Sequence, residues 1–154
     1  MATTGDTRLQ LLDREELAAW RGLLRAHAAL TRELDAELSD THGLPLSSYE
    51  VLLHLHQAPG GRMRMSDLAD SVLLSRSGLT RLVDRLERDG LLERIRCKED
   101  ARGLFAAITD KGRAVFGEAR PTHLDGVKRL FLRHFTRDEL RVLAELWRRL
   151  GVRP

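Results

Sequence analysis

The stretch that most constrains this chain runs from Met65 to Arg102 and contains two short helical patterns, a sharp connection and a charged hairpin. Ser66 is a typical N-cap residue and predicts the start of the first helix. After Ser75, apolar residues recur at the spacing of one helix face: Leu79, Leu82, Val83 and Leu86. Gly90 then predicts the end of the second helix, because glycine readily adopts the left-handed conformation found there.

The polar face of the second helix carries side chains suited to duplex DNA. It combines hydroxyls with arginines: Ser75, Arg76, Ser77, Thr80, Arg81 and Arg85. Small hydroxyl side chains let a backbone approach the floor of a groove, and guanidinium groups bind guanine edges or phosphates. The helix N-terminus adds partial positive charge and free N–H groups. The alternative is a solvated helix face whose arginines serve solubility.

Each of these residues has an expected role at a DNA surface. We expect base or near-base contacts from Arg76, Ser77, Thr80 and Arg81. We expect Arg85 to contact phosphate. Ser75 and Ser66 have double roles, because each is placed both to cap a helix and to bind phosphate.

Two strand-like runs, 91–96 and 104–109, flank a charged, glycine-containing tip and predict a β-hairpin. Between 94 and 102 the basic residues outnumber the acids: Arg94, Arg96, Lys98 and Arg102 against Glu99 and Asp100. A basic hairpin beside such a helix is the winged form of the helix-turn-helix, in which the helix enters the major groove and the wing reaches a minor groove or phosphates. We expect phosphate contacts from Arg96 and Lys98, whereas Arg94 and Arg88 are interpreted as surface or salt-bridge residues.

The combination of these motifs resembles the multiple-antibiotic-resistance-regulator (MarR) family. The similarity is carried by Ser66-x-Leu68-Ala69, by Ser75-x-Ser77-x-Leu79-Thr80-x-Leu82-Val83-x-x-Leu86-x-x-x-Gly90-Leu91 and by Asp100-x-Arg102. Ile108-Thr109 stands where the family has Leu-Thr, followed by x-x-Gly112. The resemblance covers about 17–150. It implies that Arg102 enters the minor groove and that Asp100 braces an arginine of the wing.

The remaining chain predicts further helices on both sides of this stretch. Capping boxes at Asp13/Glu16, Ser47/Glu50 and Thr136/Glu139 and a cap at Thr109 predict four helix starts. Gly43 and Pro45 predict the end of the first, long helix, and Pro121 predicts a kink or a break. Arg62 to Met65 alternates as a short strand beside the wing would. The expected fold is mainly α: a winged helix-turn-helix, with a three-helix core plus a β-hairpin wing, at 46–110, and dimerisation helices at 10–42 and 111–154 of a single 1–154 chain.

The two ends of the chain carry more apolar residues than a small winged-helix core needs. Those near the C-terminus are Phe131, Leu132, Phe135, Leu143, Leu146, Trp147 and Leu150. We predict a homodimer that is built from both chain ends and binds a pseudo-palindromic operator. The alternative for these residues is an intramolecular helical cap. The resemblance implies the same dimeric arrangement, and it leaves repressor and activator both open, with repressor preferred.

A small ligand is a further expectation from the resemblance. In this family a cleft between the dimer helices and the reading domain admits small aromatic or phenolic anions, and Trp20, Arg25, His27 and His54 are the residues here that could line it. For Trp20, a role in the core or the interface is the competing interpretation. A ligand could release DNA only if its affinity differed between two dimer conformations in which the DNA-binding helices are spaced differently.

Composition excludes several other classes. The chain is 42% hydrophobic and 32% charged, as is typical of a globular domain. Its net charge is only +3, so the evidence for DNA binding comes from the positions of the arginines and not from the total charge. We expect a cytoplasmic protein, because no apolar run is long enough to span a membrane. The single cysteine, Cys97, excludes a disulfide framework, and the histidines lack zinc-site spacing, so we expect no metal and no cofactor. No pairing of a nucleophile with a base indicates an enzyme. The rival interpretation is a winged-helix protein–protein module without DNA binding.

Overall fold

The computed structural model describes residues 12–72, 76–99 and 103–151. The helices are α1 (Arg14–His42), α2 (Leu46–Gln57), α3 (Met65–Ser71), α4 (Arg76–Arg88), α5 (Asp110–Leu130) and α6 (Arg137–Arg149), with short 3-10 turns at Pro59–Gly61 and Leu132–His134. The strands are β1 (Arg62–Arg64), β2 (Leu92–Arg96) and β3 (Leu104–Ile108). This order confirms the predicted fold class, a mainly helical chain with a winged helix-turn-helix.

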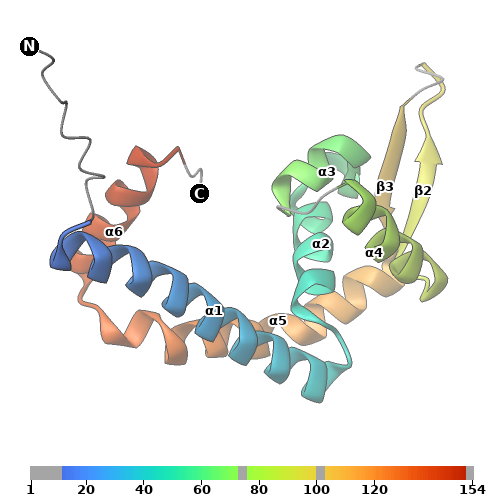
Figure 1. Ribbon diagram of the computed structural model, residues 1–154. Coiled ribbons are helices and arrows are strands. Elements are labelled where there is room, and N and C mark those ends of the chain that lie inside the picture. The colour runs from blue at the N-terminus through green and yellow to red at the C-terminus, as the bar shows by residue number, and fades with distance from the viewer. Residues whose placement is uncertain (1–11, 73–75, 100–102, 152–154) are drawn as a thin grey trace, which may run out of the picture.

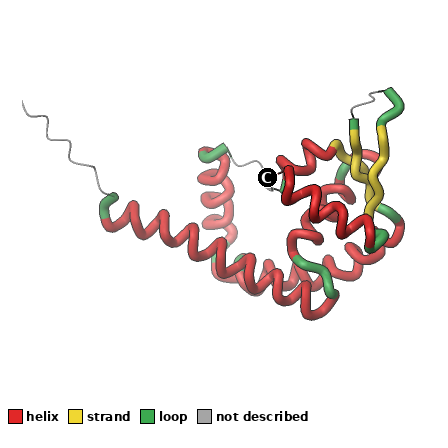
Figure 2. The backbone as a smooth tube through the Cα atoms, turned by 45° about the vertical axis from the view of Figure 1, so that its right-hand side comes forward, coloured by secondary structure: helices red, strands yellow, loops and turns green. Residues whose placement is uncertain are grey.

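The long helices α1 and α5 lie side by side and connect two differently built ends of the molecule (Figure 1). At one end, α2, α3, α4 and the sheet form the winged helix. At the other end stands α6, which both views show well separated from the wing (Figure 2). None of the helices in the described ranges is long and apolar enough to cross a membrane.

Two predicted capping boxes are confirmed. The Asp13 carboxylate accepts hydrogen bonds from the backbone N–H groups of Glu15 and Glu16, each at 2.8 Å, and the Glu16 carboxylate accepts from the Asp13 N–H at 2.9 Å. Thr136 and Glu139 form the same reciprocal pair at the start of α6. Helix α1 ends where predicted, at a left-handed Gly43 with φ 62°.

Two N-cap predictions are wrong, and in both cases the helix begins one residue earlier than the proposed cap. Helix α3 starts at Met65, so Ser66 lies inside its first turn. Helix α2 starts at Leu46 after Pro45, and Ser47 caps nothing. The backbone N–H of Leu46, the first residue of α2, instead donates to the Asp35 carboxylate of α1 at 2.7 Å. A residue eleven positions away thus replaces the local cap, which sequence spacing does not reveal.

Pro121 lies inside α5 without ending it. The predicted break is therefore absent, since α5 runs unbroken from Asp110 to Leu130. At the start of α5 the Thr109 hydroxyl accepts from the Gly112 N–H at 3.0 Å, which confirms the predicted cap. Close packing explains the glycine at position 112, because a Cβ there would lie 2.0 Å from the carbonyl oxygen of Leu91.

Most of the hydrophobic core lies within the winged helix. The apolar stripe of α4 is buried as predicted, with Leu79, Leu82, Val83 and Leu86 at most 7% exposed. The three strands are antiparallel in the order β1-β3-β2, with Arg64 opposite Phe105 and Arg96 opposite Leu104. The sheet therefore joins the strand before α3 to the hairpin after α4, and α3 and α4 are held between these two strands of the chain.

Candidate nucleic-acid interface

Helix α4 presents a polar face on the side opposite its buried stripe. Ser77, Thr80 and Arg81 are all exposed on that face, in the first two turns of the helix. Their hydroxyl and guanidinium groups are therefore at the end of α4 where the backbone carries partial positive charge. Ser75 and the side chain of Arg76 lie outside the described residues.

The wing begins as a regular hairpin and carries basic side chains. The Cys97 N–H donates to the carbonyl of Gly103 at 2.9 Å, which extends the β2–β3 pairing toward the tip. Arg96 and Lys98 are exposed on this segment, as a role in phosphate contact requires. Asp100 and Arg102, to which the resemblance assigns the bracing and minor-groove roles, lie outside the described residues.

Strand β1 adds a basic feature that sequence reasoning missed. The guanidinium groups of Arg62 and Arg64 lie 5.7 and 5.0 Å from the centre of the Phe105 ring, which is cation–π distance. The alternation of Arg62, Met63 and Arg64 was interpreted only as a strand. The structure confirms the predicted strand beside the wing, and the pairing of β1 with β3 places both arginines beside an aromatic ring.

Arg85 is attached to the body of the domain. Its guanidinium donates to the hydroxyl of Ser48 on α2 at 3.2 Å. Ser48 is only 1% exposed, so this bond gives a buried hydroxyl its partner. Arg85 therefore links α4 to α2, a role that the spacing of polar residues along α4 did not indicate.

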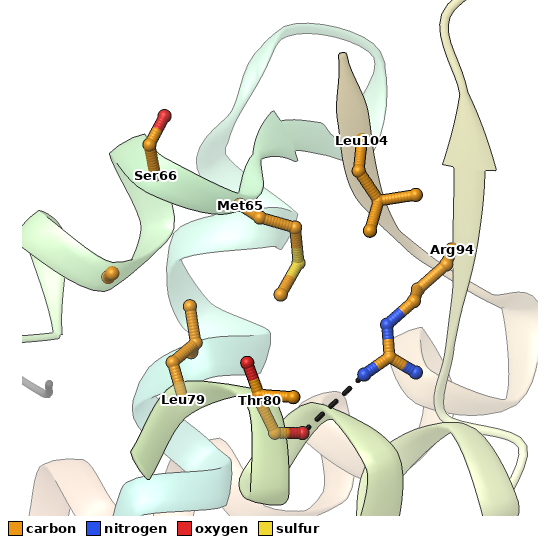
Figure 3. Close-up of a pocket in the computed structure, with 7 residues that line it drawn as sticks. Met65, Ser66, Leu79, Thr80, Arg94 and Leu104 are labelled. Carbon is orange, nitrogen blue, oxygen red and sulfur yellow. Dashed lines mark hydrogen bonds between the residues drawn. The ribbon is translucent and has the colours of Figure 1, made fainter. Parts of the chain in front are cut away.

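The structure confirms the interpretation of Arg94 as a salt-bridge residue. From β2 its guanidinium forms ion pairs with Asp84 and with Glu87 of α4, the latter at 2.5 Å, and donates to the Thr80 carbonyl at 3.5 Å. Figure 3 shows it reaching toward α4 across a cavity of about 320 Å³ that Ser66, Met65 and Leu104 also line. The hydrogen bond from the Arg94 N–H, with the guanidinium beside it, lowers the pKa of Glu87.

The four residues expected to line a ligand cleft are dispersed within the single chain. Trp20, Arg25 and His27 are exposed along α1, with Trp20 53% exposed. His54 lines a different space, a cavity of about 480 Å³ bordered by Arg62, Arg64 and Phe105. Burial lowers the pKa of His54. The described residues contain no group of three or more histidine, cysteine, aspartate or glutamate side chains placed to hold a metal ion.

Comparison with known proteins gives a consistent result. The family model described as the MarR family matches residues 42–103. AbsC, a MarR family transcriptional regulator from Streptomyces coelicolor, is 34% identical, with a TM-score of 0.87 over 92% of this chain and 95% of that one. Sco3205 from the same organism, solved in complex with DNA, is also 34% identical, with a TM-score of 0.88 over 94% and 92% of the two chains.

A curated relative extends the similarity to a regulator of known role. The homoprotocatechuate degradative operon repressor of Escherichia coli is 30% identical over 105 residues, which are 68% of this chain and 69% of the repressor. These relatives are transcription regulators rather than enzymes. With the exposed polar face of α4 and the basic wing, these similarities show that the chain belongs to the MarR family of winged-helix, DNA-binding transcription regulators.

Proposed function

We propose that this protein is a cytoplasmic repressor that binds a pseudo-palindromic operator as a homodimer. The observation that carries the proposal is the pairing of an exposed hydroxyl-and-arginine face on α4 with basic side chains on the adjoining wing. A repressor of this kind acts sterically, because the bound dimer covers promoter DNA. The relatives support this role, since the E. coli protein is named as an operon repressor.

We propose the following contacts with DNA. Ser77, Thr80 and Arg81 face the major groove, with Arg76 and Ser75 beside them at the start of α4. Ser66, Arg96 and Lys98 contact phosphates, and Arg102 enters the minor groove with Asp100 as its brace. The phosphate contact expected of Arg85 is not proposed again, because its guanidinium is bonded to Ser48. A forked guanidinium contact to guanine contributes about 1–3 kcal/mol of discrimination against other bases.

Exposed apolar side chains support the dimer. Among the described residues, large hydrophobic side chains that are exposed lie almost entirely outside the winged helix: Leu12, Trp20, Leu23, Leu24, Leu124, Leu132, Phe135, Val142, Leu146 and Leu150. Leu104 is the exception. Many exposed apolar side chains on neighbouring helices mark a surface that a partner covers. A second copy of the same chain is that partner.

Two-fold symmetry then determines the shape of the operator. A dimer presents two α4 helices to successive major grooves, about 34 Å apart along the duplex. Each chain reads one half-site, and the symmetry of the protein makes the site a pseudo-palindrome. Binding at both half-sites raises the overall affinity above that of one winged helix alone.

We also propose that a small aromatic or phenolic ligand releases the repressor. Trp20, Arg25 and His27 lie on the helix expected to enter the dimer contact, and His54 lines a cavity with Phe105 and two arginines. The aromatic ring and guanidinium groups suit an aromatic anion. Such a ligand acts only if its affinity differs between DNA-bound and free dimers. Calorimetry with aromatic carboxylates, with and without operator, measures that difference.

Selection of bound sites from random duplex DNA tests the proposed function. We expect enrichment of a pseudo-palindrome with half-sites about one helical turn apart. The affinity for that site should fall steeply with salt, because several phosphate contacts release counterions. Recovery of no preferred sequence, or a salt-independent affinity, would overturn the proposal and favour a protein–protein module.

A charge reversal on α4 tests the assigned face. Arg81→Glu should abolish selective binding, because it replaces a donor with a carboxylate facing the duplex. Arg32→Glu is the matched control, since Arg32 is an exposed arginine of α1 whose side chain is 73% accessible. Equal binding by Arg81→Glu and the control would contradict the assignment of this face.

A further inference from the structure

We propose that Arg94 is a positioning residue that holds the recognition helix α4 at a fixed distance and rotation from the wing. This inference rests on the proposed DNA contacts, and it assigns Arg94 a role in affinity without contact to DNA. It deepens that proposal by naming what keeps the two DNA-binding elements together.

The contacts of Arg94 extend along most of α4. Its guanidinium is paired with Asp84 and Glu87, three residues apart, and donates to the carbonyl of Thr80. Its backbone N–H donates to the Glu87 carboxylate at 3.0 Å. One residue of β2 therefore holds α4 at positions 80, 84 and 87, almost two turns of the helix. A planar guanidinium suits this role because it binds several acceptors in a fixed geometry.

The partial burial of Arg94 makes these pairs stronger than ordinary surface pairs. The Arg94 side chain is 21% accessible, whereas those of Asp84 and Glu87 are 53% and 39% accessible. Solvent screens a partly buried guanidinium less than one on the surface. The contact also lowers the pKa of Glu87, so this carboxylate stays ionised against Arg94.

Apolar packing does not fill the space that Arg94 crosses. A cavity of about 320 Å³ separates Met65 of α3, Leu79 of α4 and Leu104 of β3, and the Arg94 guanidinium lies at its edge (Figure 3). At the base of the hairpin, Leu92 of β2 shares one buried core with the apolar stripe of α4. Farther along β2, beside the cavity, the ion pairs of Arg94 hold α4 and the hairpin together.

This geometry matters for binding because α4 and the wing enter neighbouring grooves of one duplex. If the helix rotates or the hairpin moves away, base and phosphate contacts cannot form together. Loss of Arg94 should therefore weaken binding to the preferred site far more than binding to random DNA. Arg94 itself contacts no phosphate, so the salt dependence of binding to random DNA should keep its slope.

The test uses the full chain and the duplex recovered by selection, with a random-sequence duplex of equal length for comparison. Arg94→Met removes the cation, and the double variant Asp84→Asn/Glu87→Gln removes both carboxylates while keeping the guanidinium. We expect each to lower the affinity for the selected duplex about tenfold, and the triple variant to lose no more than either. Random-duplex affinity should change less than about threefold.

The double variant separates positioning from direct contact. If Arg94 contacted phosphate, removal of two carboxylates near the duplex would maintain or raise affinity. That result would overturn the inference, as would additive losses in the triple variant. Arg129→Met is the matched control, because Arg129 forms an ion pair with Glu37 that joins α5 to α1 and involves neither α4 nor the wing. It should leave the affinity for the selected duplex unchanged.

Two checks keep the outcome interpretable. The thermal midpoint and circular dichroism of every variant show whether it folds. If Arg94→Met does not fold, the double variant decides, because its polar replacements keep the size of both side chains. A wild-type chain that selects no sequence would overturn the proposed function, whereas a selective wild type with fully active variants would overturn only the role of Arg94.

Discussion

The winged helix and the α1–α5–α6 region differ in how completely each buries its own apolar residues. Helix α2 has six buried residues in 12, whereas α1 has one, Leu38, in 29, and α6 has none. All three are regular helices with an apolar side. The winged helix, together with Leu38 of α1 and with Phe116 and Ala119 of α5, encloses a core within one chain. Much of α1 and all of α6 instead leave their apolar side chains partly or fully exposed.

A core substitution in the winged helix should have the largest effect. Leu52 is 0% exposed, and Leu52→Ala should lower the free energy of unfolding by about 2–5 kcal/mol because it leaves a cavity. Leu150 of the other region is 66% exposed within one chain, and Leu150→Ala should cost the monomer less than about 0.5 kcal/mol. Urea denaturation at one low protein concentration, at which the chain is monomeric, compares the two variants. Similar losses would contradict the distinction between the two regions.

A charge on α6 should break the dimer and leave the winged helix folded. Val142 is 58% exposed, and Val142→Asp should weaken association by about 2 kcal/mol if this face forms the dimer. Sedimentation velocity across protein concentrations measures the shift toward monomer. Leu104→Asp is the control, because Leu104 is an exposed leucine on the winged helix. A Val142→Asp chain that dissociates no more readily than the control would assign the interface to another surface.

Loss of a helix cap should have a smaller effect, and one that depends on the region. Thr136→Ala removes the hydroxyl that accepts from the Glu139 N–H at 3.3 Å, and should cost about 1 kcal/mol. Because α6 has no buried residue, this loss should appear mainly in the concentration dependence of unfolding. Thr136→Ser keeps the cap and serves as the control. A loss that is independent of concentration would show that α6 is stabilised within one chain.

The sequence predicted most strongly what depends on neighbouring residues. The α4 stripe, the Asp13 and Thr136 capping boxes and the hairpin all follow from spacings of a few positions, and the structure confirms them. The wrong cap at Ser47 has a long-range cause, since Asp35 of α1 caps α2 in its place. At Pro121 the structure contradicts the break, and α5 continues through this residue while it packs along α1.

The same limit applies to the candidate site. The exposed hydroxyls and Arg81 were identifiable, because helix spacing places them on one face. The contacts of Arg94 with α4, and that of Arg85 with Ser48, depend on how α4 packs against the hairpin and α2. The sequence indicated a salt-bridge role for Arg94 but not its partners, and it predicted a phosphate contact for Arg85. The structure identifies the protein groups that each of these two arginines contacts.

The smallest expected effect concerns His123, which lies on α5 where the two regions meet. Its ring packs on Tyr49 with centroids 4.4 Å apart, and its Nδ1 is buried with no hydrogen-bond partner in the described part of the chain. Burial lowers the pKa of His123. The unfolded chain therefore binds a proton near pH 6.5, whereas the folded chain binds it only at lower pH. The contribution to stability is complete above about pH 6.5 and decreases as the pH falls below it.

His123→Phe keeps a ring against Tyr49 and removes the proton. The free energy of unfolding of this variant should therefore fall less between pH 7 and pH 5 than that of the wild type. His54, whose pKa is also lowered by burial, leaves part of the dependence in place. His134→Phe is the control, because His134 is exposed in the 3-10 turn that follows α5. If wild type and His123→Phe show parallel pH profiles, His123 does not contribute to the pH dependence of stability in this range.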